Sequence, residues 1–309
     1  MEPSQLTGSL LTPRVGWACG TIRRGAAHAD QNLRCQDAFH ISQGAVSGRA
    51  YFCAAVADGH GDSRHDLSDI GAALAVQVAT QELIKLRDAH DTPDEPRLRR
   101  SFQDDVGRIV TRRWRAAVAE DAAARLETQL LPEAQEMLPV RYGTTLLLSL
   151  ITEQSVLLGQ LGDGDIVWLR ADGHFDQPFA SSGPAIGTET DSLCSSEATL
   201  RWQTTSFDRG QGGTLFLASD GVENCFADER GLQDYLRHVS TSSGLQSSPI
   251  NSPVGWTSCP LKAVGMTSRW WRSESTTSSR RVDVPPVRIQ VLETGFILPR
   301  PRETRTTDG

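Results

Sequence analysis

The feature that most constrains this fold is a set of short apolar runs that each stop at an aspartate. Runs of five to eight apolar residues bounded by turn residues are typical of buried β-strands. The runs and their aspartates are AYFCAAVA (50–57) before Asp58, SVLLGQL (155–161) before Asp163, and TLFLA (214–218) before Asp220. A fourth aspartate, Asp37, follows Cys35-Gln36 at the start of another short run. We therefore expect several buried strands that end in carboxylates.

A single Asp-Gly pair is ordinary turn chemistry, but a repeated pattern indicates a metal site. Carboxylates gathered at one sheet edge repel one another unless cations neutralise them. Oxygen ligands select Mg²⁺ or Mn²⁺ over Zn²⁺, and the glycine after Asp58 lets a backbone carbonyl approach an ion. Two such ions would activate a bridging water toward a phosphorus atom. His60 is the candidate for protonating the leaving oxygen.

Helical and strand periodicities alternate along the chain. Apolar residues at helical spacing predict amphipathic helices over 69–89 and 97–128. Short mixed or apolar runs predict strands at 15–24, 36–42, 142–152 and 166–171. Strands, two long helices and then further strands favour an α+β domain in which helices pack on sheets.

Composition excludes several classes of protein. The net charge of −7 argues against nucleic-acid binding, which usually requires a basic face. None of the six cysteines forms a Cys-x-x-Cys pair, so a structural zinc site is not expected. The sequence contains no signal peptide and no stretch of 18 apolar residues, which predicts a cytoplasmic protein with no membrane partner.

Four motifs occur along the chain, namely Val56-Ala57-Asp58-Gly59-His60-Gly61, Gly143-Thr144-Thr145, Leu161-Gly162-Asp163 and Leu217-Ala218-Ser219-Asp220-Gly221. In their order and spacing, these motifs resemble those of the metal-dependent PP2C (PPM) Ser/Thr protein phosphatases, and the resemblance covers about residues 15–235. Three further segments are similar to the bacterial branch, namely Cys35-Gln36-Asp37-Ala38, Ser68-Asp69-Ile70-Gly71-Ala72 and Glu189-Thr190-Asp191-Ser192-Leu193.

The resemblance implies a four-layer αββα sandwich of two antiparallel sheets flanked by helices. It also implies two catalytic Mn²⁺ or Mg²⁺ ions and phosphorylated proteins, substrates of Ser/Thr kinases, as partners. By the same resemblance, Asp37, Asp58, the Gly59 carbonyl and Asp220 would hold these ions, and Asp163 would hold a third. His60 would be the general acid, and residues 181–193 the flap beside the site. His28 or Arg34 would bind the substrate phosphate, although either also suits an ordinary surface role.

Two positions depart from the family pattern. Asn224 stands where many relatives have a further aspartate. The family's final strand, which carries Gly-x-Gly-Asp-Asp-x-Thr and one metal ligand, has no counterpart after Asp220. We therefore expect the terminal strand to be missing or replaced. The expected organisation is an N-terminal extension (1–14), a phosphatase domain (15–240) and a disordered or out-of-frame tail (241–309).

The tail itself suggests how the motif was lost. A shifted reading of the codons for residues 262–271 can encode Gly-Ser-Gly-Asp-Asp-Val-Thr-Val-Val. In that frame Met266-Thr267 forces an aspartate codon and Trp270-Trp271 forces a valine codon, whatever the wobble bases. The hypothesis is that the chain changes frame between about residues 238 and 254; the alternative is a genuine divergent tail.

Three functions stay open at this point. The first is a metal-dependent phosphatase that hydrolyses phosphoserine and phosphothreonine. The second is a pseudophosphatase that keeps the fold as a binding or regulatory module after losing a metal ligand. The third, a different two-metal phosphoesterase or nuclease, fits the acidic composition less well. A serine hydrolase is disfavoured because the chain has no Gly-x-Ser-x-Gly motif, and Gly210-Gln211-Gly212-Gly213 is expected to form a turn.

Overall fold

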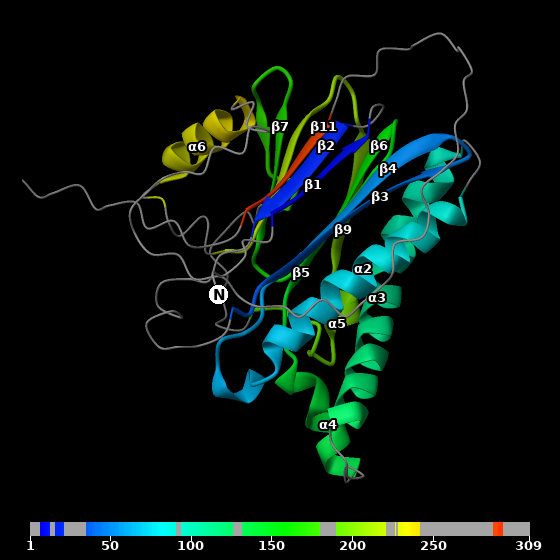
Figure 1. The fold of residues 1–309 in the computed structure, drawn as a ribbon, viewed down its shortest axis with the longest axis vertical. Coiled ribbons are helices and arrows are strands. Elements are labelled where there is room, and N and C mark those ends of the chain that lie inside the picture. The colour runs from blue at the N-terminus through cyan, green and yellow to red at the C-terminus, as the bar shows by residue number, and fades with distance from the viewer. Residues whose placement is uncertain are drawn as a thin grey trace, which may run out of the picture.

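The computed structural model describes residues 7–12, 16–21, 35–90, 94–125, 132–179, 190–220, 226, 228–241 and 287–292. Two β-sheets stack face to face, and helices cover both outer surfaces (Figure 1). The arrangement is therefore the expected four-layer αββα sandwich.

The five-stranded sheet is antiparallel throughout, in the order β3-β4-β5-β6-β9. Its strands are β3 (Ala38–Val46), β4 (Arg49–Ala57), β5 (Leu146–Ile151), β6 (Ser155–Leu161) and β9 (Gln203–Asp208). Every residue of β5 and β6 is buried, which explains why these segments are continuous apolar runs in the sequence.

The six-stranded sheet has the order β1-β2-β11-β10-β7-β8. Its strands are β1 (Thr7–Thr12), β2 (Gly16–Thr21), β7 (Asp165–Arg170), β8 (Phe175–Asp176), β10 (Gly213–Ala218) and β11 (Val287–Leu292). β11 runs parallel to both of its neighbours, β2 and β10, whereas the other pairs are antiparallel. This sheet is therefore antiparallel except where β11 joins it.

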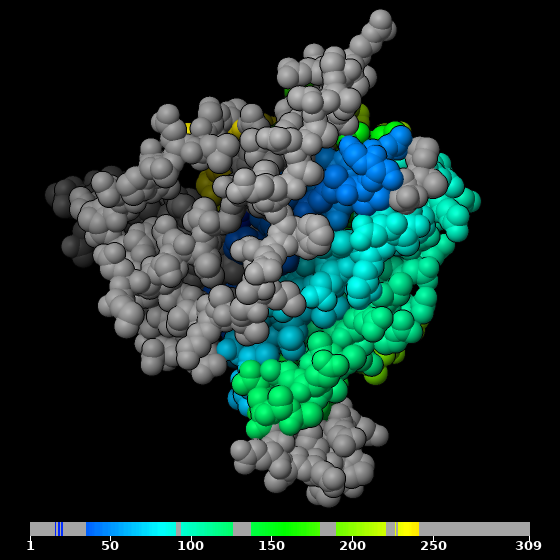
Figure 2. Space-filling view, turned by 45° about the vertical axis from the view of Figure 1, so that its right-hand side comes forward, coloured from blue at the N-terminus to red at the C-terminus, as the bar shows by residue number. Residues whose placement is uncertain are grey.

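Helices α2 (Ser68–Asp88) and α3 (Glu95–Arg125) cover the five-stranded sheet, and Figure 2 shows part of this outer helical face. Helix α6 (Glu229–Thr241) packs on the six-stranded sheet. The remaining helices are short: the 3₁₀ helix η1 (Ser63–His65), α4 (Pro132–Arg141) and α5 (Ala198–Arg201). None of the helices in the described ranges has an apolar stretch of the length that a membrane crossing needs.

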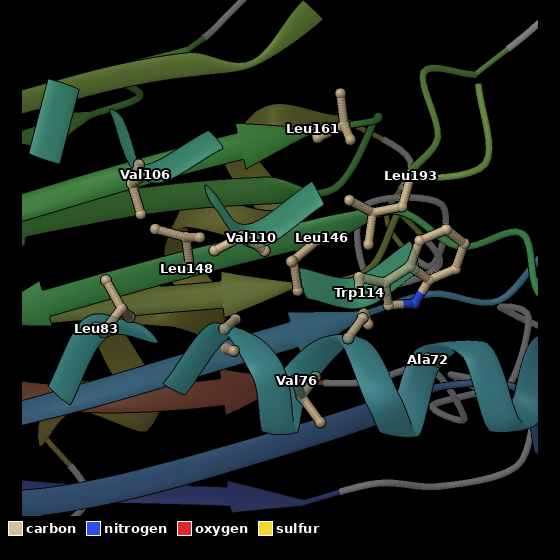
Figure 3. Close-up of a cluster of buried hydrophobic side chains, with 14 of the residues drawn as sticks. Ala72, Val76, Leu83, Val106, Val110, Trp114, Leu146, Leu148, Leu161 and Leu193 are labelled. Carbon is tan, nitrogen blue, oxygen red and sulfur yellow. The ribbon is translucent and has the colours of Figure 1, made fainter. Parts of the chain in front are cut away.

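Three buried clusters fill the three spaces between the four layers. Strand β4 contributes to two of them, because successive side chains point to opposite faces of a sheet. Its Cys53 and Ala55 lie toward α2 and α3, whereas Phe52 and Ala54 lie between the sheets. Figure 3 shows the helix-side cluster, in which Trp114 of α3 is fully buried.

The tail contributes one strand to the six-stranded sheet. β11 lies beyond residue 240 and inserts between the N-terminal strand β2 and the buried strand β10. Its residues, VRIQVL, contain no carboxylate. The expectation of a replaced terminal strand matches this arrangement, and the assignment of residues 241–309 to a disordered or out-of-frame tail stays a prediction.

Candidate functional site

Two of the predicted carboxylates meet at the end of the first hairpin. Asp37 immediately precedes β3 and Asp58 immediately follows β4. The antiparallel register pairs Ala38 with Ala57, so the two aspartates are opposite one another at the same edge of the five-stranded sheet. The apolar strand residues thus place two acidic side chains side by side.

The other two carboxylates come from the ends of strands in both sheets. Asp163 follows β6, and Asp220 lies two residues beyond the end of β10. Ala218, the last residue of β10, pairs with Asp165, the first residue of β7, which follows directly after Asp163 and Gly164. The four predicted aspartates therefore lie at one end of the sandwich.

The electrostatics of Asp58 show how strongly these groups interact. The pKa of Asp58 is raised to about 9. The largest cause is burial, followed by the charge of Asp37, a hydrogen bond with Asp37, and the charges of Asp220 and Asp163. Without a compensating cation, Asp58 therefore holds a proton at neutral pH. This set of carboxylates has the acidic character that a divalent cation would neutralise.

The backbone around Asp58 is held by two threonines from the segment that precedes β5. The Asp58 carbonyl accepts hydrogen bonds from the Thr145 amide (2.9 Å) and the Thr144 hydroxyl (2.8 Å). The Asp58 amide donates to the Thr145 hydroxyl at 3.2 Å. These bonds fix the position of the chain from which the Asp58 carboxyl group projects.

Gly59 is packed too closely for any side chain. Its amide donates to the Gln36 carbonyl at 3.1 Å. A Cβ atom at this position would lie 2.7 Å from that carbonyl oxygen and 2.9 Å from the Ser68 carbonyl oxygen. The glycine therefore lets the loop that carries Asp37 lie directly against the Asp58 loop.

Asp163 and His60 complete the group of predicted residues. The Asp163 carboxylate accepts a hydrogen bond of 2.8 Å from the Thr190 hydroxyl, so the segment after residue 189 reaches the site. The His60 amide donates to the Gly143 carbonyl at 3.2 Å. Burial and neighbouring His65 lower the pKa of His60, while Asp163 and Asp62 oppose this shift.

The donor chemistry fits a hard divalent cation, but a complete ligand set is not assembled. Among the described residues, no three histidine, cysteine, aspartate or glutamate side chains converge closely enough to hold one ion. Two oxygen atoms that flank the aspartates, Gln36 Oε1 and Ser219 Oγ, are buried without a hydrogen-bond partner within the same ranges. This end of the sandwich therefore offers oxygen atoms to a cation, without three convergent ligand side chains in the described ranges.

Several sequence predictions fall outside the described residues, namely His28, Arg34, Asn224 and positions 181–189 of the flap. Conversely, the roles of Thr145, Thr190 and His65 were not predicted. The first two had a sequence signal, because both lie in motifs shared with the phosphatase family. His65 had none, since its contact with His60 arises only from the path of η1.

Comparison with solved structures finds chains of low identity. The catalytic domain of the serine threonine protein phosphatase PstP, solved with two manganese ions, is 18% identical over 65% of this chain and 84% of that chain, with a TM-score of 0.40. A bacterial serine phosphatase is 15% identical over 75% and 85% of the two chains (TM-score 0.43). PppA of Pseudomonas aeruginosa is 19% identical over 65% and 84% (TM-score 0.39).

No curated protein matches the chain. The family comparison is more decisive: the model of the family described as Protein phosphatase 2C matches residues 24–249, which is well over half of the 309 residues. The match includes Asp37, Asp58, His60, Asp163 and Asp220 and ends before β11. This chain therefore belongs to the protein phosphatase 2C family of Ser/Thr protein phosphatases.

Proposed function

We propose that the chain is a metal-dependent phosphoprotein phosphatase that hydrolyses phosphoserine and phosphothreonine. The observation that carries this proposal is the placement of four strand-end aspartates at one end of the sandwich. Burial and the nearby charges of Asp37, Asp220 and Asp163 raise the pKa of Asp58 to about 9. Acidic side chains whose pKa is raised in this way by burial and by neighbouring negative charges are typical of a functional site rather than of a turn.

Asp37, Asp58, the Gly59 carbonyl and Asp220 would hold two Mn²⁺ or Mg²⁺ ions, and Asp163 would hold a third. When bound, such ions supply a water of lowered pKa and orient it toward phosphorus. Either ion suits this site, because carboxylate and carbonyl oxygens are ligands for both Mg²⁺ and Mn²⁺.

The chain's own residues would then act on the substrate. An oxygen from water forms the new bond to phosphorus while the bond to the serine or threonine oxygen breaks. His60 would hold a proton for that leaving oxygen, which is a poor leaving group without one. The substrates would be proteins phosphorylated by Ser/Thr kinases in the cytoplasm, and His28 or Arg34 would bind the phosphate.

The test is release of phosphate from a phosphothreonine peptide with Mn²⁺, with Mg²⁺ and after chelation. We expect weak turnover that requires the metal and that Asp58→Asn or Asp220→Asn abolishes. Asp172→Asn is the matched control, because Asp172 is exposed in the turn between β7 and β8. Turnover that survives both chelation and Asp58→Asn would contradict the proposal.

A pseudophosphatase is the second candidate, favoured by the specific loss of the terminal motif. The described strand beside β10, VRIQVL, does not carry the family's Gly-x-Gly-Asp-Asp-x-Thr motif. Binding of a phosphothreonine peptide without detectable turnover at saturating Mn²⁺ would support this function over catalysis.

A further inference from the structure

Two histidine rings pack against each other beside the aspartates. The ring centroids of His60 and His65 lie 4.7 Å apart, with 57° between the ring planes. His60 follows the Asp58-Gly59 pair at the end of β4, whereas His65 is the last residue of η1. The candidate general acid therefore has a second imidazole as an immediate neighbour.

His65 is itself fixed in place. Its side chain is buried, with 9% of its surface exposed, and its Nδ1 atom contacts the Val140 carbonyl oxygen. Because a carbonyl oxygen only accepts hydrogen bonds, Nδ1 must carry the proton. The orientation of the His65 ring is thus determined by the backbone of α4.

Gly143 provides the space in which both rings lie. A Cβ atom at Gly143 would be 2.4 Å from His65 Nδ1 and 2.8 Å from His60 Cδ2. The Gly143 carbonyl also accepts the hydrogen bond from the His60 amide. The backbone at Gly143 therefore lies against both imidazoles, and any side chain there would push them apart.

The loop that carries His65 is tied to the same segment by two further contacts. The Leu67 amide donates to the Arg141 carbonyl at 2.9 Å. The Arg141 guanidinium makes two hydrogen bonds to the Asp66 carboxylate, of 2.7 and 2.5 Å. The end of α4 and the residues around η1 therefore form one connected wall beside His60.

We propose that His65 is a positioning residue for His60. Its ring, held through Nδ1 by the Val140 carbonyl, packs on the His60 imidazole and sets the direction in which that imidazole faces. This inference rests on the proposed function, because positioning matters for turnover only if His60 donates a proton to the leaving oxygen.

The role predicts a selective effect on substrates. A serine or threonine oxygen needs a proton as it leaves, whereas p-nitrophenolate is stable without one, so only the first reaction depends on the general acid. A misdirected His60 should therefore slow phosphothreonine hydrolysis far more than hydrolysis of p-nitrophenyl phosphate. A general loss of folding or of metal would slow both.

The experiment compares His65→Leu and His65→Asn in the full chain with Mn²⁺. We expect His65→Leu to lower kcat for a phosphothreonine peptide by about tenfold, with p-nitrophenyl phosphate changed less than about threefold. His65→Leu should add nothing further in a His60→Ala background, because both changes act through one group. Equal losses on the two substrates, or additive losses, would overturn the proposal.

His65→Asn separates the hydrogen bond to the Val140 carbonyl from the packing of the ring against His60. An asparagine amide still donates a hydrogen bond to the Val140 carbonyl but removes the ring that touches His60. The proposal expects His65→Asn to keep the folding stability closer to wild type than His65→Leu does, yet to show the same selective loss. Full recovery of phosphothreonine turnover in His65→Asn would show that ring packing is irrelevant.

The matched control is His90→Asn. The Nδ1 atom of His90 likewise contacts a backbone carbonyl, that of Leu86 at 2.8 Å, and its Nε2 lies 3.1 Å from the Ser101 hydroxyl. This histidine lies just beyond the C-terminal end of α2, so its substitution should leave the ratio of the two activities unchanged.

A spectroscopic readout separates failure of this inference from failure of the proposed function. In ¹⁵N spectra of the imidazoles, His65 should be protonated at Nδ1, and His65→Asn should shift the His60 resonances whereas His90→Asn should not. If the wild-type chain hydrolyses neither substrate but this shift is present, the phosphatase proposal fails and the positioning stands. Unshifted His60 resonances would refute the positioning, whatever the activity.

Discussion

The protonation of Asp58 links the site to the stability of the metal-free protein. Its pKa is raised to about 9 in the folded chain from an ordinary value of 3.8, so the folded state binds the proton more tightly than the unfolded state. Stability from this group is therefore fully present below pH 4 and is lost as pH rises toward 9.

The chelated protein should accordingly unfold more easily as pH increases from about 5 to 9. One proton changes the free energy of unfolding by at most about 1.4 kcal/mol per pH unit. Urea titrations at several pH values would measure this slope, and Asp58→Asn should flatten it. An unchanged slope in Asp58→Asn would assign the effect to another group.

Single residues differ in how far the sequence determines their roles. The common location of Asp37, Asp58, Asp163 and Asp220 could be predicted because each lies within two residues of a strand end, and strand direction carries them to one end of the sandwich. Their roles as metal ligands stay predictions. The contact of His65 could not be predicted, because it depends on how η1 turns back against α4. Nothing local in Ser63-Arg64-His65 encodes that turn.

Among whole elements, α2 depends on one glycine where it crosses the segment before β5. A Cβ atom at Gly71 would lie 1.9 Å from the Tyr142 carbonyl oxygen, and the Gly71 carbonyl accepts a hydrogen bond from the Trp114 indole. Gly71→Ala should therefore lower the free energy of unfolding by about 1–3 kcal/mol or more.

Gly231 is the matched control for this prediction, since it is also a helical glycine. A Cβ atom there would meet no atom closer than 3.4 Å. Gly231→Ala should instead stabilise the protein by up to about 1 kcal/mol, because alanine favours a helix more than glycine does. Urea denaturation measures the change in the free energy of unfolding in both variants. A change of the same sign in Gly71→Ala and Gly231→Ala would contradict the packing argument.

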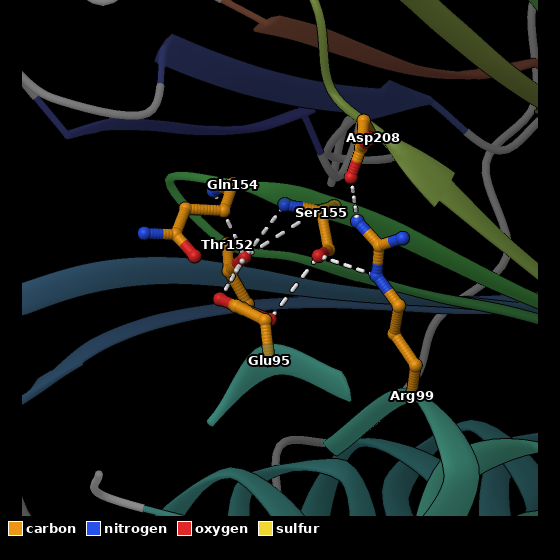
Figure 4. A network of polar contacts seen from close by, with 6 residues as sticks. All are labelled: Glu95, Arg99, Thr152, Gln154, Ser155 and Asp208. Carbon is orange, nitrogen blue, oxygen red and sulfur yellow. Dashed lines mark hydrogen bonds and ion pairs between the residues drawn. The ribbon is translucent and has the colours of Figure 1, made fainter. Parts of the chain in front are cut away.

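The start of α3 is joined to the β5–β6 turn by a polar network (Figure 4). The Glu95 carboxylate accepts hydrogen bonds from the Thr152 hydroxyl (2.9 Å) and the Ser155 hydroxyl (3.1 Å), both of which are buried. Arg99 extends the network to Ser155 and Asp208. The network therefore joins helix α3 to strands β6 and β9 of the five-stranded sheet.

Glu95→Ala would leave two buried hydroxyl groups without this partner. The expected cost is about 1–3 kcal/mol of unfolding free energy, measured by urea denaturation. Glu120→Ala, on the exposed face of the same helix, should change it by no more than about 0.5 kcal/mol. Equal effects at both positions would show that the network contributes nothing beyond helix propensity.

Elements with a single strong periodicity were predicted best. The strand at 155–161 has the expected bounds, and the helices at 69–89 and 97–128 correspond to α2 and α3. β9 was missed because QTTSFD is largely polar and only partly buried at the sheet edge. β11 was missed because its role depends on the space between two distant strands rather than on its own sequence.

At the scale of the whole molecule, the tail decides whether the sandwich is complete. The family match ends at residue 249, and β11 lies beyond it. Parallel insertion of VRIQVL satisfies backbone groups of β2 and β10 that would otherwise be unpaired. We still expect this chain to be less stable and less active than one that carries the family motif.

A frame-corrected chain tests this expectation directly. Restoring Gly-Ser-Gly-Asp-Asp-Val-Thr-Val-Val in place of the present tail should tighten Mn²⁺ binding, raise Tm and increase phosphothreonine turnover. Calorimetric titration and thermal unfolding of the two proteins would measure the difference. Sequencing codons 235–275 from independent DNA shows which form is natural, and robust Mn²⁺-dependent turnover by the present chain would contradict the prediction.

The position of β11 also constrains the order of events during synthesis. β1 and β2 leave the ribosome well before β10, and β11, which bridges them to β10, is made after all the other described strands. At about 5–20 residues per second, the N-terminal strands would wait roughly 15–60 s for that bridge. β2 presents an open edge throughout this interval, and β10 does so once it has been made, so nascent chains should depend on chaperones that shield such edges from one another.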